Sequence, residues 1–124
     1  MIEAKKVKSI EELLKLKTEI AEDRDKIYEF YASSIDSIIK YKKASRIDIL
    51  KIEELPRQDA DMYNIYAHVI EPNLADKTLQ EAYNKGKKPY EIVDALLKPS
   101  EVIALSREIA QVDDIKKTVA DIKN

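Results

Sequence analysis

The chain has 124 residues, of which 37% are charged, one is glycine and none is cysteine or tryptophan. A chain of this length forms one domain, and its single glycine disfavours both a sheet with tight hairpins and a glycine-rich phosphate loop. The net charge of −2 excludes a large basic field for nucleic acid, the lack of cysteine excludes disulfides, and no apolar stretch is long enough to span a bilayer.

The N-terminal part of the chain predicts helix. Ser9 followed by Glu12 is a capping-box pattern that starts a helix. Apolar residues then keep an approximate one-face spacing as far as Tyr31, which predicts one long amphipathic helix or two helices broken near residues 21–25. The signal after that is ambiguous, and a single short strand or hairpin near residues 35–44 stays open.

The middle of the chain is divided by prolines. Ser45 is predicted to cap a short helix that ends before Pro56, because the residue before a proline is disfavoured in the α conformation. Asp59 is predicted to cap the central helix, which has a wide apolar surface and ends at Pro72. We expect this helix to be central to the fold.

Two further helices and a long terminal one are predicted. One runs from Leu74 to Tyr83 and is stopped by Gly86 in a left-handed conformation, and Pro89 starts the next. The last opens at Ser100, and its apolar residues recur at steps of three or four to the end of the chain. This spacing predicts a seam for another chain rather than a wedge in the core, formed by Val102, Leu105, Ile109, Val112, Ile115, Val119 and Ile122.

The predicted fold class is therefore all-α: a compact bundle of five to seven short helices over residues 1–112, followed by a C-terminal helical extension over residues 113–124. The candidate partner-binding residues are two tyrosines, whose apolar body and polar end suit partner surfaces, and part of the C-terminal stripe. They are Tyr63, Tyr66, Val102, Leu105, Ile109 and Val112. The alternative for the tyrosines is that they close the rim of a small core.

Groups suited to catalysis or metal binding are few. The sole histidine, His68, has no obvious serine or cysteine partner, and we expect it to lie near Glu71 on the same helix face. Together with Asp59 and Asp61 these residues could supply metal ligands, but their spacing fits neither H-E-x-x-H nor an EF-hand loop. We expect no catalytic, cofactor-binding or metal site.

Three segments carry a resemblance to a known family. DADMYNIYAHVIEPNLADKTLQEAY, PYEIVDALLKPSEVIALSREIA and KYKKASRIDIL resemble the XkdN-like tail assembly chaperones of tailed bacteriophages and prophages, over roughly residues 40–112. That family has a V-x-E-P-N-L turn, a helix end near a Tyr and a Gly, and a P-(Gly or Ser)-E-(Ile or Val) junction. The matching positions are Val69, Glu71, Pro72, Asn73 and Leu74; Tyr83 and Gly86; and Pro99, Ser100, Glu101 and Val102.

The resemblance implies a non-enzymatic protein of the bacterial host cytoplasm, not retained in the mature virion. Its expected partner is the long, helical tape-measure protein, with the major tail protein as a second candidate and self-association through the C-terminal stripe. It implies no cofactor and no membrane. The alternative function is that of a small helical nucleic-acid-binding or regulatory protein of phage or prophage origin, based on the basic cluster Lys40-Tyr41-Lys42-Lys43 with Arg46.

Overall fold

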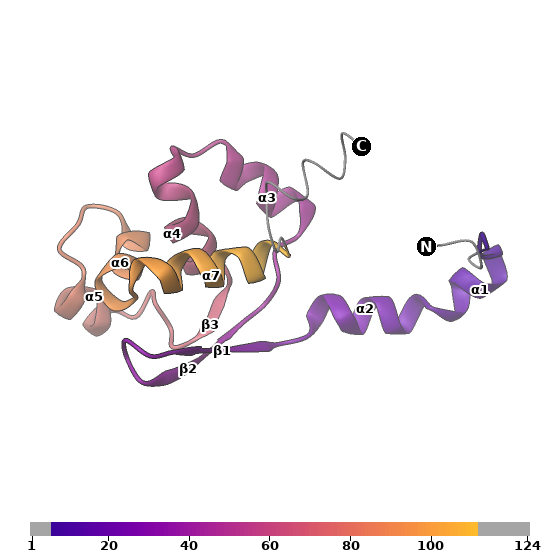
Figure 1. Cartoon of the computed structure of the whole chain (residues 1–124), viewed down its shortest axis with the longest axis horizontal. Coiled ribbons are helices and arrows are strands. Elements are labelled where there is room, and N and C mark those ends of the chain that lie inside the picture. Colours follow the sequence, from indigo (N-terminus) through magenta and orange to yellow (C-terminus); the bar gives the residue numbers. More distant parts are fainter. Residues whose placement is uncertain (1–5, 112–124) are drawn as a thin grey trace.

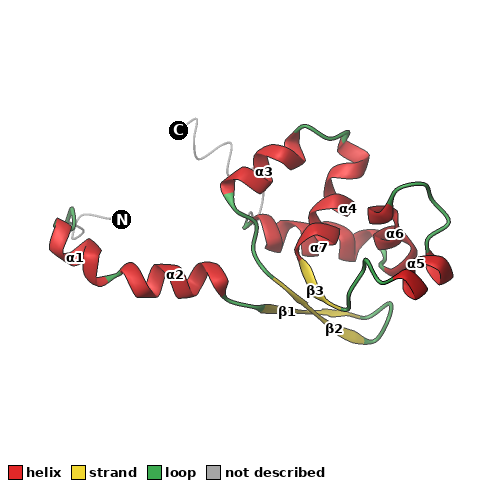
Figure 2. Cartoon of the chain, turned by 180° about the vertical axis from the view of Figure 1, so that it is seen from behind, coloured by secondary structure: helices red, strands yellow, loops and turns green. Residues whose placement is uncertain are grey.

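A computed structural model describes residues 6–111 of the chain, apart from the side chains of residues 23 and 24. It has two parts (Figure 1): an N-terminal pair of helices, α1 (Ile10–Lys15) and α2 (Lys17–Asp25), and a body in which helices cover one face of a small sheet. We call residues 9–25 the arm. The arm leads directly into the first strand and projects away from the body in both views (Figures 1 and 2).

The body contains β1 (Tyr28–Ala32), β2 (Ser37–Tyr41), α3 (Arg46–Glu53), α4 (Arg57–His68), β3 (Val69–Glu71), α5 (Lys77–Tyr83), a 3₁₀ turn η1 (Pro89–Glu91), α6 (Ile92–Leu96) and α7 (Pro99–Ala110). The strands form one antiparallel sheet in the order β1-β2-β3. The described residues thus combine seven α-helices with three strands.

The predicted all-α class is wrong, because the protein is an α+β fold. The end of the predicted first helix, residues 28–32, forms β1, whose side chains alternate between the helix-covered face and the outer face. β2 lies within the segment where a strand was left open. The hairpin needs no glycine, because Asp36 takes the left-handed conformation, with φ of 46°, and its carboxylate accepts a 2.6 Å hydrogen bond from the Tyr31 hydroxyl.

Several predicted helix boundaries are confirmed. Ser9 and Ser45 both form complete capping boxes, and Pro89 occupies the first turn of η1. The break in the N-terminal helix falls at Leu16, earlier than predicted, where the Leu16 N–H bonds the Leu13 carbonyl and tightens the turn.

Other boundaries differ. α4 starts directly after Pro56, so Asp59 lies in its first turn and does not cap it. α4 also ends at His68, before Pro72, because residues 69–71 pair with β2. Gly86 is not left-handed; a Cβ there would overlap the carboxylate of Glu91, which accepts a 2.9 Å hydrogen bond from the Lys88 N–H.

The core lies between α4, α7, α6 and the inner face of the sheet. α7 packs along α4, and this contact buries Val102, Leu105 and Ile109. The outward-facing seam predicted for this part of the stripe is therefore wrong: it is the core face of α7. Val112 and the predicted extension over residues 113–124 lie outside the described residues.

Candidate functional site

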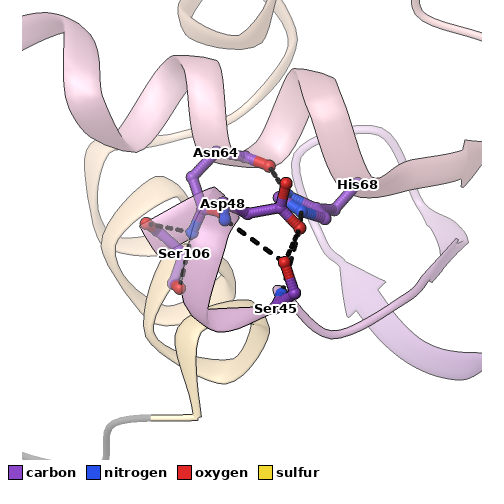
Figure 3. A network of polar contacts seen from close by, with 5 residues as sticks. All are labelled: Ser45, Asp48, Asn64, His68 and Ser106. Carbon is purple, nitrogen blue, oxygen red and sulfur yellow. Dashed lines mark hydrogen bonds and ion pairs between the residues drawn. The ribbon is translucent and has the colours of Figure 1, made fainter. Parts of the chain in front are cut away.

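A polar network joins the start of α3 to the end of α4 (Figure 3). His68 Nε2 lies 3.1 Å from Asp48 Oδ2, and His68 Nδ1 lies 2.8 Å from the Asn64 carbonyl oxygen. The Ser45 hydroxyl donates to the same Asp48 oxygen at 2.9 Å. Serine and histidine thus both bind the carboxylate instead of each other, whereas a nucleophilic relay needs the histidine next to the serine.

This network is suited to holding two helices together. The backbone N–H of Ser45, and then the His68 ring, hold the pKa of Asp48 at about 2, so its carboxylate is charged at neutral pH. His68 does not face Glu71, which was its predicted neighbour. Glu71 lies on the far side of the sheet, 3.8 Å from Lys40 Nζ.

A second contact, between α4 and α7, centres on the buried amide of Asn64. Its Nδ2 donates to the Ser106 carbonyl at 3.0 Å and to the Ser106 hydroxyl at 3.1 Å. The Ser106 hydroxyl in turn donates to Asp61 Oδ1 at 2.7 Å. Asn64 Oδ1 is buried without a hydrogen-bond partner among the described residues, so this cross-link is only partly satisfied.

The four candidate metal ligands bind separate partners. Asp59 accepts hydrogen bonds from Lys88 and Tyr90, and Asp61 accepts one from Ser106. His68 contacts Asp48, and Glu71 pairs with Lys40. Between residues 6 and 111, no three His, Cys, Asp or Glu side chains gather closely enough to hold a metal ion.

The basic cluster is also divided by the fold. Tyr41 is buried, and its hydroxyl donates to Glu108 at 2.8 Å, so its ring is not available to stack on a base. Lys40 pairs with Glu71, and the Lys43 ammonium lies 4.5 Å from the centre of the Tyr28 ring. The ring inside the predicted cluster, Tyr41, is therefore not offered to a base, and the ring that Lys43 contacts is Tyr28.

The predicted partner-binding residues do not form one exposed surface. Leu105 and Ile109 are 0% exposed and Val102 is 6% exposed. Tyr63 is half-buried, with its ring edge-to-face against Tyr90, and Tyr66 packs against the core, as the rim alternative expects. A partner therefore cannot reach Val102, Leu105 or Ile109 in the folded chain, whereas Val112 lies outside the described residues.

The arm carries a row of exposed apolar side chains, and others, such as Ile47 and Leu50 of α3, lie on the body. Ile10, Leu13, Leu14 and Ile20 are 75%, 51%, 66% and 46% exposed. They line a shallow groove of about 410 Å³ together with Lys17 and Ala21. Helices of six and nine residues are marginal in water without packing partners, so packing against another surface would stabilise the arm. The signal was present in the sequence as apolar residues at 10, 13, 14, 20 and 21, but it was used only to predict an amphipathic helix.

The interior offers little room for a ligand. An apolar void of about 10 Å³ lies among side chains that include Ile39, Ile65 and Val93. This volume holds about one water molecule. The groove on the arm is the candidate site that the described residues favour.

The described residues include no helix that combines the length and the apolar character needed to cross a membrane. Comparisons with protein-family models, with curated proteins and with solved structures found no match to this chain. The resemblance to the XkdN-like chaperones therefore stays a prediction.

Proposed function

We propose that the protein is a non-catalytic tail assembly chaperone of a tailed phage or prophage, and that its arm holds helical segments of the tape-measure protein in the host cytoplasm. The observation that carries this proposal is the row of exposed aliphatic side chains on the arm. The resemblance over residues 40–112 supplies the identity of the partner, with the major tail protein as a second candidate.

The arm has the geometry that helix recognition uses. A helix that docks through an apolar face uses anchors at i, i+3, i+4 and i+7, and Ile10, Leu13 and Leu14 of α1 supply the first three of these positions. Burying an aliphatic side chain stabilises a complex by about 1.5–3 kcal/mol, so a few such anchors give a useful affinity without hydrogen bonds to particular side chains. Such a surface accepts many sequences.

A long, repetitive partner strengthens this weak binding, because it offers many sites along one chain. Each copy of the chaperone needs only a short apolar stripe, and successive copies along one helical chain give avidity. Covering those stripes keeps the partner from aggregating until the tail tube forms around it. On this proposal the protein is released during assembly and is not retained in the mature virion.

The proposal is tested by binding of the purified protein to fragments of a tape-measure protein, measured by isothermal titration. The double variant Leu13→Ser/Leu14→Ser should weaken binding by about 100-fold, as expected for two lost anchors. The matched control is Ile47→Ser/Leu50→Ser, which removes two exposed aliphatic side chains from α3 and should bind as the unaltered chain does.

Circular dichroism should show that both double variants keep a folded body. Binding that is lost in the α3 variant and retained in the arm variant would place the partner elsewhere. A chain that binds no tape-measure fragment at all would reject the chaperone function.

A further inference from the structure

The end of α7 and the base of the arm meet at one residue, Tyr41. Its ring stacks on the ring of Tyr28, the first residue of β1, with the ring centres 5.8 Å apart. Its hydroxyl donates to Glu108, in the last turn of α7, at 2.8 Å. The residues that follow α7 therefore start beside the point where the arm joins the sheet.

α7 ends in a way that redirects the chain. Gln111 is left-handed, with φ of 61°, and its N–H bonds to the carbonyls of Arg107 and Glu108. A left-handed residue in this place is a common helix end, and the chain leaves it on a new axis. The stripe predicted from Val102 to Ile122 is therefore interrupted, and α7 does not set the direction of its second half.

That second half has the pattern of a helix that packs along one other helix. Its apolar residues alternate at steps of three and four, and they are Val112, Ile115, Val119 and Ile122. At 1.5 Å per residue, residues 112–124 span about 20 Å as a helix. The arm has the same number of residues between positions 13 and 25.

We propose that, in the protein without a bound partner, residues 112–124 form a helix that lies antiparallel along the arm and covers its apolar groove. In this arrangement Val119 lies at the level of Ile20, and residue 124 reaches the level of Leu14. Ile10, at the tip of the groove, stays uncovered, so a competing helix can begin there. The contact does not depend on the function of the arm, whereas its role in regulating the binding of a tape-measure segment rests on the proposed function.

The charges at the base of the arm match those at the start of the segment. The ammonium groups of Lys26 and Lys43 lie 5.2 Å and 4.5 Å from the centre of the Tyr28 ring. Asp113 and Asp114 are the first charged residues after α7, and they enter this positive region.

The next charges outward along the arm are of the opposite sign. Glu22 and Asp25 line a second hollow, which adjoins the apolar groove because Lys17 and Ala21 line both. Lys116 and Lys117 follow in the segment, and in the antiparallel arrangement they lie at the level of residues 21 and 22. The order of signs along the segment therefore complements the order along the arm.

α3 is the alternative place for the segment. Its exposed residues Ile47 and Leu50 are also near the end of α7, because the Ala44 N–H bonds the Ile109 carbonyl at 2.8 Å. These two residues match only half of a four-residue stripe, whereas the arm offers four exposed aliphatic side chains.

Disulfide crosslinking of the full chain distinguishes the two places, because the sequence contains no cysteine of its own. The variant Ile20→Cys/Val119→Cys, oxidised at low micromolar concentration without a partner, should form a disulfide within the chain. The matched control is Ile47→Cys/Val119→Cys, and we expect it to form its disulfide about 10-fold more slowly, since the segment is held at the arm. Equal rates, a faster control or disulfides formed only between chains would overturn the proposal.

Binding to tape-measure fragments tests the regulatory role. Val119→Ser/Ile122→Ser should bind about 10-fold more tightly than the unaltered chain, because the groove no longer has to be uncovered. Asp121→Ser/Lys123→Ser alters the same segment off the stripe, and its affinity should not change; equal affinities for both variants would reject the regulatory role. A chain that forms the disulfide but binds no fragment keeps the contact and rejects the chaperone function, whereas fragment binding without the disulfide does the reverse.

Discussion

Replacing one leucine by alanine in α7 and one in the arm distinguishes a core position from a position on the proposed binding surface. Leu105 is 0% exposed, in the contact between α7 and α4, whereas Leu14 is 66% exposed on the arm. Leu105→Ala should lower the free energy of unfolding by about 2–5 kcal/mol, from lost burial plus the cavity left behind. Leu14→Ala should change it by less than about 0.5 kcal/mol. Leucine and alanine differ little in helix propensity, so the difference reports packing.

Urea denaturation followed by circular dichroism measures both values, and an unchanged slope with denaturant shows that both variants unfold as the parent does. Thermal unfolding gives a second estimate: at about 4 °C per kcal/mol for a domain of this size, Leu105→Ala should melt roughly 8–20 °C lower. If Leu105→Ala unfolds at the same urea concentration as the parent, the packing of α7 on α4 is wrong and the outward-facing seam predicted from sequence is correct.

Three further outcomes are expected. Urea midpoints should fall on acidification, because the pKa values of Asp48 and Glu101 are lowered to about 2. The contribution of these two carboxylates to the free energy of unfolding is therefore complete above about pH 5 and is lost as the pH falls towards 2. Asp48→Asn should flatten this pH dependence. Asn64→Ala should cost about 1–3 kcal/mol in denaturant unfolding, since it removes both buried hydrogen bonds from the Asn64 amide to Ser106, and a cost near zero would contradict that role. Gly86→Ala should cost about 1 kcal/mol by displacing the Glu91 carboxylate from its hydrogen bond, and in a double-mutant cycle the cost should disappear in a Glu91→Ala background.

Local signals in the sequence were sufficient to predict features that neighbouring residues determine. The capping boxes at Ser9 and Ser45 are closed within four residues, and Pro56 and Pro89 act on the adjacent backbone. Such features depend on nothing distant in the chain, so the helix starts after Ser9 and Ser45 and at Pro89, and the helix end before Pro56, are confirmed.

Features that depend on distant contacts were not predicted. Tyr28, Phe30 and Tyr31 favour a strand by propensity, but Phe30 and Tyr31 also continue the helical spacing of the preceding apolar residues, and pairing with β2 decides between the two. The direction of the α7 stripe depends on α4, which lies some forty residues earlier and covers it. The arm has the same kind of stripe and no such cover among the described residues, a difference that periodicity alone cannot reveal.

Only Lys26 and Ile27 join the arm to the first strand, and neither arm helix packs closely on an element of the body among the described residues. Its side chains are therefore released from the constraints that govern interior positions. On the proposed function, mutations there alter recognition while leaving the rest of the molecule as thermostable as before. Selection could then adjust this segment to a new target independently of the globular part that carries it.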